Sequence, residues 1–167
     1  MSTEATDLPE RPGERPKTGP AIPHQQLSQN APASLQEELW GRMSGLEGVR
    51  TGPSGVSLPE TRALHLDREL AGGPPEAFMV GTEFAHLHGS EDGSLHLSLP
   101  SDLAREAIER GWAELHPLAR SGQLPQTLVM VYGPRESGEL ETVWRLVAAS
   151  YEYARGSSLR PDGEARP

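Results

Sequence analysis

The sequence predicts an α+β domain: a four-stranded, mainly antiparallel sheet with helices packed on one face, in the order α-β-β-β-α-β-α. Three observations carry this prediction. Two short strands joined by a five-residue loop with glycine at both ends predict a hairpin over residues 77–99. The continuous apolar run at 127–132 is typical of a strand buried on both faces. Residues 137–151 then carry an apolar stripe at helical spacing.

Local signals predict the first elements along the chain. Ser34 is a candidate N-cap for a helix whose apolar residues recur at helical spacing as far as Leu46. The aliphatic and β-branched residues from 56 to 66 predict a strand. Pro59 favours an edge position for that strand, since proline lacks the N–H that a central strand must donate.

The hairpin is expected to consist of strands at 77–88 and 94–99. Pro100 ends the second strand, and Ser101 is positioned to cap the helix that follows. That helix should stop at Gly111, because glycine readily adopts the left-handed conformation that ends many helices.

Composition predicts three parts along the chain. Residues 1–33 are rich in Pro, Glu, Gln and Ser and show no periodic apolar pattern, so we expect a disordered, proline-rich arm. Residues 34–155 are expected to fold as a single α+β domain. Residues 156–167 share the polar character of the arm and are expected to form a disordered tail.

Charge and residue usage exclude several classes of partner. The net charge is −9 and no cluster of Lys and Arg occurs, so we expect no nucleic-acid partner and no anionic membrane partner. The absence of cysteine excludes disulfides, thiolate metal sites and cysteine nucleophiles. The polar amino terminus has no apolar leader segment, which predicts a cytoplasmic location. The sequence does not determine the oligomeric state.

The hairpin concentrates histidines on one face. In a strand, side chains two residues apart share a face, so His86 and His88 lie together, and Phe84 extends the row. A loop over residues 89–93 pairs position 86 with position 96, which makes His96 a direct cross-strand neighbour of His86. The opposite face then carries leucines, at Leu87, Leu95, Leu97 and Leu99.

Strict alternation places Glu83 on the leucine face. A carboxylate there is either at a bend in the strand or buried with a partner such as Arg62. The leucine face should meet the helices, so the histidine face should look toward solvent, a covering segment or a partner subunit.

Five motifs in order along residues 50–155 resemble the luciferase-domain family, which is named after the fungal luciferases: EFAHLH, DGSLHLSLP, AREAIERGWAELHPLA, LVMVYGPR and ELETVWRLVAASY. Fungal luciferases oxidise a hydroxylated styryl-pyrone with molecular oxygen, without a known flavin or metal, and many bacterial members have no assigned activity. The resemblance therefore implies neither light emission nor a cofactor. The fungal proteins begin with an apolar segment that this polar arm lacks, so membrane association does not carry over.

The first functional hypothesis is a cofactor-independent, oxygen-using enzyme, or a binder, for a small acidic aromatic or pyrone-like molecule. One imidazole would take the proton of an enol, and a protonated neighbour would stabilise the resulting anion. The candidates for these roles are His86, His88 and His96, joined by His116 from a loop. The candidate ligand contacts are Phe84 and Trp112 as aromatic walls and Arg135 as a contact for an anion.

Two alternatives remain open at this stage. Three imidazoles on adjacent strands match the ligand supply of a mononuclear Zn²⁺ or Fe²⁺ site, although a carboxylate ligand would have to come from elsewhere and the family resemblance favours no metal. The chain could instead be a non-catalytic binding or scaffold domain, whose histidines are polar residues on a solvated sheet face.

Overall fold

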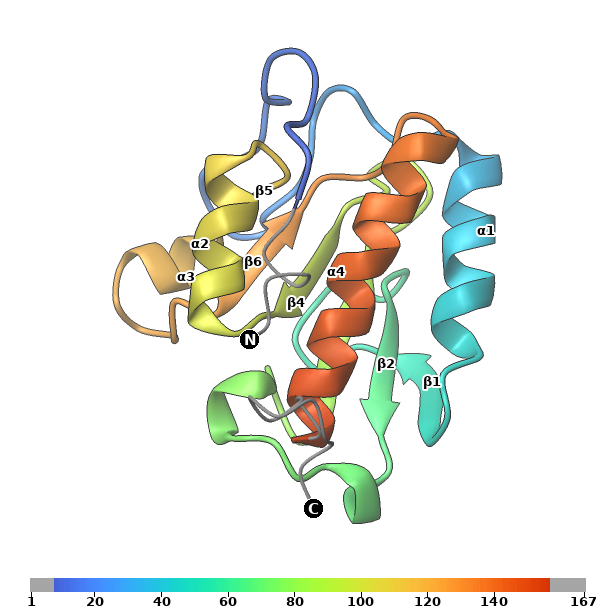
Figure 1. The fold of residues 1–167 in the computed structure, drawn as a ribbon, viewed down its shortest axis with the longest axis vertical. Coiled ribbons are helices and arrows are strands. Elements are labelled where there is room, and N and C mark those ends of the chain that lie inside the picture. The colour runs from blue at the N-terminus through green and yellow to red at the C-terminus, as the bar shows by residue number, and fades with distance from the viewer. Residues whose placement is uncertain (1–7, 157–167) are drawn as a thin grey trace.

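The computed structural model describes residues 8–156. Its centre is an antiparallel sheet of six strands in the order β1-β2-β3-β4-β6-β5 (Figure 1). The strands are β1 (Val49–Pro53), β2 (Arg62–Leu66), β3 (Glu83–Leu87), β4 (Leu95–Ser98), β5 (Ala113–Leu115) and β6 (Leu128–Val131). The α+β class and the antiparallel sheet are confirmed, but the sheet has six strands rather than the predicted four.

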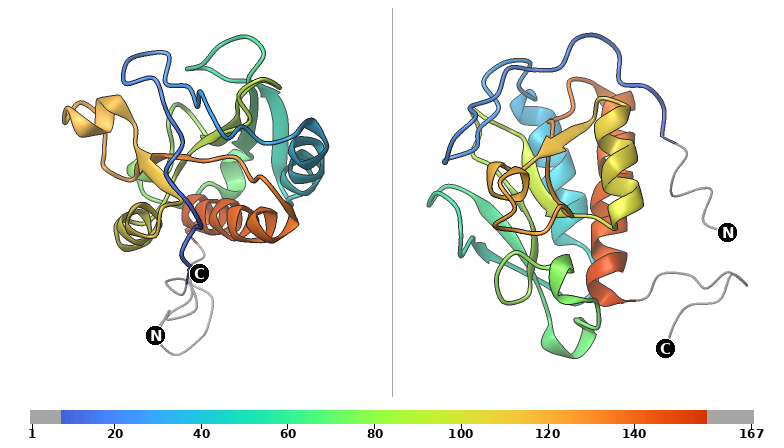
Figure 2. Two further views of the ribbon diagram at one scale, coloured as in Figure 1. Left: turned by 90° about the horizontal axis from the view of Figure 1, so that it is seen from above. Right: turned by 90° about the vertical axis from the view of Figure 1, so that its left-hand side faces the viewer.

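The helices are α1 (Ala33–Ser44), α2 (Ser101–Glu109), α3 (Pro117–Arg120) and α4 (Ser137–Arg155), with 3₁₀ turns at Arg68–Leu70 and Pro75–Ala77. Helices α1, α2 and α4 lie on one side of the sheet (Figure 2). Among the residues that the structure describes, no helix combines the length and the apolar character needed to cross a bilayer.

The two strands that the sequence did not predict lie at the edges of the sheet. β1 pairs only with β2, and its side chains are largely exposed, so its sequence carries no apolar alternation. β5 is three residues long and pairs only with β6. The predicted strand at 56–66 is shorter than expected, because residues 54–61 form a loop and β2 begins at Arg62.

The leucine face of the hairpin forms the core, as predicted. The four leucines of that face are fully buried, and they pack in one apolar cluster with α4 and α2 residues such as Val143, Val147 and Leu103. Helix α4 ends at Gly156, whose φ of 72° is the left-handed conformation that favours glycine at this position. The core therefore holds the hairpin with its other face directed away from the helices.

The hairpin register matches the prediction. The backbone N–H of His88 donates to the carbonyl of Ser94 over 2.9 Å, which closes a loop over residues 89–93. Gly93 has a φ of 78°, a conformation that side-chain-bearing residues rarely adopt. His86 therefore pairs directly with His96.

One irregularity corrects the predicted alternation. Leu64 of β2 pairs with Ala85, whereas the next residue, His65, pairs with Glu83, so Phe84 is an extra residue in β3. Such a bulge resets which face each side chain meets. Phe84 is fully buried in the core, with its ring centroid 6.0 Å from that of Tyr151, and Glu83 lies on the histidine side.

Residues 8–32 differ from the expected disordered arm. This segment begins on the helix side, passes over one end of the sheet and then lies on the face opposite α4, as does the loop at 54–61 (Figure 2). Leu8 is 3% exposed in the core cluster, and Gln26 and His24 are also buried. Hydrogen bonds of polar groups, rather than an apolar stripe, hold the segment in place; the N–H of Gly133, for example, donates to the side chain of Gln26. The composition of the segment therefore did not indicate that it is ordered. The predicted tail beyond residue 156 lies outside the described residues.

Candidate functional site

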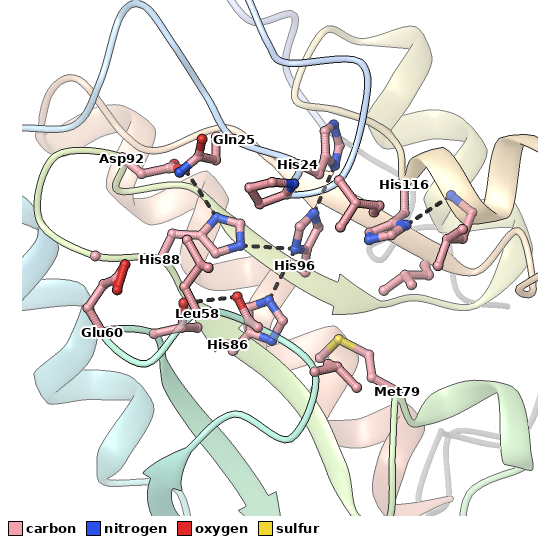
Figure 3. Close-up of a pocket in the computed structure, with 18 of the residues that line it drawn as sticks. His24, Gln25, Leu58, Glu60, Met79, His86, His88, Asp92, His96 and His116 are labelled. Atoms are coloured by element: carbon pink, nitrogen blue, oxygen red, sulfur yellow. Dashed lines mark hydrogen bonds and ion pairs between the residues drawn. The ribbon is translucent and has the colours of Figure 1, made fainter.

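Five histidines gather on the sheet face opposite α4 (Figure 3). His86 comes from β3, His88 follows it, His96 comes from β4, and His116 is the N-cap of α3. The predicted cluster is thus present: the ring centroid of His96 lies 5.2 Å from that of His86, 4.5 Å from that of His88 and 4.8 Å from that of His116. The fifth histidine is His24, from the segment expected to be disordered, so only its residue type could have suggested it.

The bulge in β3 gives His86 a carboxylate partner. Oε2 of Glu83 lies 2.8 Å from Nδ1 of His86, and the same carboxylate accepts from the hydroxyl of Ser54 and the N–H of Gly55. Burial raises the pKa of Glu83, but these donors outweigh it and hold that pKa below its ordinary value. Glu83 is therefore ionised at neutral pH, and His86 carries its proton on Nδ1.

A second carboxylate orients His88 through a hydroxyl. Oγ of Ser94 donates its single hydrogen to Oδ1 of Asp92. Nδ1 of His88 lies 2.9 Å from Oγ of Ser94. Burial raises the pKa of Asp92, but its hydrogen bonds with His88 and Ser94 outweigh burial and hold that pKa below its ordinary value. The group is therefore a carboxylate. Because the hydroxyl hydrogen is committed, Nδ1–H of His88 must be the donor.

The third carboxylate, Glu114 of β5, holds the histidine that comes from the arm. Oε2 of Glu114 lies 2.7 Å from Nε2 of His24 and also accepts from the hydroxyl of Thr18, while Oε1 accepts from the hydroxyl of Tyr132. Burial raises the pKa of Glu114, but these contacts lower it below its ordinary value. In neutral His24 the proton thus lies on Nε2, and Nδ1 accepts a hydrogen bond over 2.9 Å from Nε2 of His96.

Burial and neighbouring charges lower the pKa values of three histidines of the cluster, His86, His96 and His116. Burial, with repulsion from the neighbouring imidazoles, lowers the pKa of His96 well below its ordinary value. Burial also lowers the pKa of His86, against the opposing effect of Glu83. Burial lowers the pKa of His116 to about 4. Since Nδ1 of His116 accepts from the N–H of Leu118 over 3.0 Å, its proton lies on Nε2.

A pocket of about 870 Å³ opens over the cluster, and all five histidines line it. Its walls come from the arm, the loop at 54–61 and the segment around α3. Half of the remaining lining residues are apolar: Ile22, Pro23, Val56, Leu58, Met79, Leu118, Leu124 and Leu128. An apolar cavity of this size with a few convergent polar groups is the usual form of a small-molecule site.

Three predicted ligand contacts lie away from this pocket. Phe84 faces the core because of the bulge. Trp112 is 2% exposed, packs in the same core and donates its indole N–H to the carbonyl of Pro9 over 2.7 Å. Arg135 is held by Glu139, with its Nε 3.0 Å from Oε1, so its charge is already paired. The catalytic roles predicted for the histidines stay predictions.

Comparison with known protein families gives a match for the segment that contains most of this site. Residues 81–150 match the family model described as the luciferase domain. The chain carries a luciferase domain. The resemblance inferred from the motifs is thereby confirmed, although the match starts at residue 81 rather than near 50. The luciferase domain runs from β3 through most of α4.

Curated relatives of the luciferase domain include the luciferases of Armillaria gallica, Armillaria mellea and Neonothopanus nambi. Each is 37% identical over 73 residues, which is 42% of this chain and 27% of the relative's length. The chain therefore matches about a quarter of the length of these relatives. No solved structure is significantly similar to the chain.

The luciferase domain contains most of the site. Four of the pocket histidines lie between residues 81 and 150, as do the three orienting carboxylates. His24 and the loop at 54–61 lie outside this range, so the segments that cover the pocket come from the part of the chain that precedes the luciferase domain.

Proposed function

We propose that this chain binds a small, planar, weakly acidic molecule, such as a hydroxypyrone or a phenol, and oxidises it with molecular oxygen. One observation carries the proposal: the pocket has apolar walls and a floor of imidazoles whose orientation is fixed by buried carboxylates. The apolar walls suit a ring system. The polar floor suits its acidic hydroxyl group.

The chemistry begins with the proton of the ligand. Nε2 of His86 and Nε2 of His88 present lone pairs, because both rings carry their protons on Nδ1. Either nitrogen takes a proton from a hydroxyl group that reaches the floor. Burial lowers the pKa of His86 and so weakens it as a base. Only an acidic hydroxyl therefore loses its proton to it, which is why the ligand is assigned to the acidic class. Nε2–H of His116 then donates a hydrogen bond to the anionic oxygen.

Oxidation follows from the electron-rich anion. Its electron pair passes to dioxygen in one-electron steps and becomes the new carbon–oxygen bond, which reduces dioxygen to the level of a peroxide. The proton held on the imidazole then moves to the outer oxygen. One substrate molecule and one dioxygen molecule give one hydroperoxide, so the step needs no external reductant.

The relatives support the reaction class. They are named luciferases, and the fungal family is associated with oxidation of a hydroxylated styryl-pyrone. Because the match covers 27% of their length, light emission is not part of the proposal. The apolar walls and the acid-selective floor support a ligand of similar chemistry.

The test measures oxygen uptake by the purified chain with a panel of hydroxypyrones and phenols. We expect wild-type protein to consume oxygen with at least one of them, and His86→Ala and His116→Ala to lower the rate by about 10²-fold or more. His65→Ala is the matched control, because His65 binds the carbonyl of Pro53 outside the pocket. Its rate should equal that of wild type.

Circular dichroism and thermal melts show whether each variant folds. Oxygen uptake that is unchanged in folded His86→Ala and His116→Ala would remove these residues from the reaction. A thermal shift with a panel compound but no oxygen uptake would instead indicate a binding protein, because ligand binding stabilises a fold by mass action.

A further inference from the structure

We infer that Nε2 of His86, Nε2 of His88 and Nδ1 of His96 bind a divalent first-row transition-metal ion on the floor of the pocket. This inference rests on the proposed function for its role there. With the ion bound, Nε2 of His86 and Nε2 of His88 would hold the metal instead of taking the ligand's proton, and the ion would lower the pKa of the ligand's hydroxyl group and stabilise the anion. The binding itself needs no organic ligand. It departs from the absence of a metal expected from the sequence.

The argument starts from the protons that the carboxylates fix. Glu83 holds the proton of His86 on Nδ1, and the pair of Asp92 and Ser94 holds that of His88 on Nδ1. In both rings Nε2 is therefore a bare acceptor.

The position of the proton on His96 is fixed by a carboxylate that acts through His24. Glu114 holds the proton of His24 on Nε2, so Nδ1 of His24 is an acceptor. Nε2–H of His96 donates to it over 2.9 Å, which leaves Nδ1 of His96 without a proton. All three inward-facing nitrogens are therefore acceptors.

These acceptors lie too close together to face one another without a cation. Nδ1 of His96 is 3.1 Å from Nε2 of His86 and 3.0 Å from Nε2 of His88. Lone pairs at such distances repel, and a single proton forms a straight hydrogen bond along only one of the two contacts. A metal ion satisfies all three nitrogens at once.

The spacing fits coordination. Metal–nitrogen bonds of about 2.0–2.1 Å place adjacent ligand nitrogens about 2.9 Å apart in an octahedron and about 3.3 Å apart in a tetrahedron. The two N–N distances of 3.0 and 3.1 Å fall between these values. The three ligand atoms all lie within 4.8 Å of one another.

The surroundings of the three rings are those of metal-binding histidines. A histidine ligand usually donates its other ring N–H to a carboxylate or a similar acceptor, which fixes the tautomer and the ring orientation. His86 does so to Glu83, His88 to the hydroxyl of Ser94, and His96 to His24. All three rings are at least 94% buried, since their exposed fractions are 2%, 6% and 4%.

A second group of close imidazoles, formed by His24, His96 and His116, lacks this convergence. There the contact between His24 and His96 already contains a proton, and Nδ1 of His116 accepts from the N–H of Leu118. The metal is therefore assigned to the first group. Three neutral imidazoles without thiolates suit Zn²⁺, Fe²⁺, Co²⁺ or Cu²⁺ rather than Mg²⁺ or Ca²⁺, and the pocket lies over the same three rings.

The test is a metal titration of the full chain, purified without a histidine tag, stripped with a chelator and kept free of organic ligands. We expect one Zn²⁺ per chain by calorimetry and a higher melting temperature in its presence. Co²⁺ should give visible absorption bands typical of nitrogen coordination. His96→Ala and His86→Ala should abolish the bands, and His65→Ala should retain them.

Glu83→Gln supplies a second, milder variant, because it removes the orienting charge while leaving the three ligands. Its Zn²⁺ affinity should fall by about 10–100-fold. Absence of stoichiometric Zn²⁺ and Co²⁺ binding by folded wild-type protein, or equal binding by folded His96→Ala, would overturn the inference. Since oxygen uptake is not measured in the titration, failure of the proposed oxidation and failure of the metal site are separate results.

Discussion

Oε2 of Glu83 lies 2.8 Å from Nδ1 of His86, although the two residues are three apart in one strand and should face opposite sides of the sheet. The bulge at Phe84 makes this contact possible, because it turns Glu83 toward the histidines and Phe84 into the core. One extra residue thus sets both the chemistry of the floor and the packing beneath it.

Phe84 should therefore contribute to stability and not to ligand binding. Phe84→Ala removes a fully buried ring, so the free energy of unfolding should fall by about 3–5 kcal/mol. Phe84→Leu preserves more of the packing and should cost less. Urea denaturation measures both, and the affinity of the folded variants for a panel compound should equal that of wild type.

Leu58→Ala is the matched control for this prediction. Leu58 lines the pocket and is 38% exposed, so its replacement should weaken ligand binding while changing stability by about 0.5 kcal/mol or less. If Phe84→Leu weakened ligand binding more than Leu58→Ala did, Phe84 would be a ligand contact after all.

The contact between His24 and Glu114 should hold the arm on the sheet. His24 is 4% exposed and lies between His96 and the carboxylate. His24→Ala leaves the buried side of Glu114 without this donor, so we expect a loss of about 1–3 kcal/mol. Hydrogen–deuterium exchange should show faster exchange of the N–H groups of Gly19 and Leu27, which pair within the arm.

The control for the arm is Arg50→Ala, because Arg50 pairs with Asp67 on the exposed edge of the sheet. Exchange within the arm should be the same in this variant as in wild type. Unchanged protection of Gly19 and Leu27 in His24→Ala would show that the rest of the arm holds itself in place.

The sequence predicted the centre of the fold because its signals there are redundant. Two leucines opposite each other and a glycine-bounded loop specify the same hairpin register, so the pairing of His86 with His96 followed from alternation alone. The family motifs pointed to the same segment. Helix α4 was predictable for a similar reason, since its buried stripe extends over several turns.

The parts that were missed depend on contacts that a local pattern does not contain. The bulge at Phe84 arises from the pairing of β3 with β2, so alternation within β3 misplaced both Phe84 and Glu83. His24 joins the site through hydrogen bonds with partners 72 and 90 residues away, His96 and Glu114. A polar segment that is ordered by such bonds has the same composition as a disordered one.

The pair of Glu139 and Arg135 should make stability depend on pH. Glu139 is 5% exposed, and its Oε1 accepts from Nε of Arg135 over 3.0 Å. Burial raises the pKa of Glu139, but its hydrogen bonds with Arg135 outweigh burial and lower it. A carboxyl whose pKa is lower in the folded state stabilises the fold above its unfolded pKa, and this contribution is lost as the pH falls through the folded pKa.

Glu139→Gln should therefore lower the free energy of unfolding at pH 7 by about 1.5–3 kcal/mol, the range for a hydrogen bond to a charged group. The difference from wild type should begin to shrink as the pH falls below about 4.3, where the carboxyl of the unfolded chain takes up a proton, and should be lost once the pH passes below the lower pKa of the folded Glu139. Urea denaturation across this range measures it. Glu141→Gln, which alters an exposed carboxylate on the same helix that pairs with Arg42, should change the pH profile much less, because solvent screens an exposed ion pair. A constant difference between Glu139→Gln and wild type from pH 7 to pH 3 would mean that packing, rather than charge, makes Glu139 important.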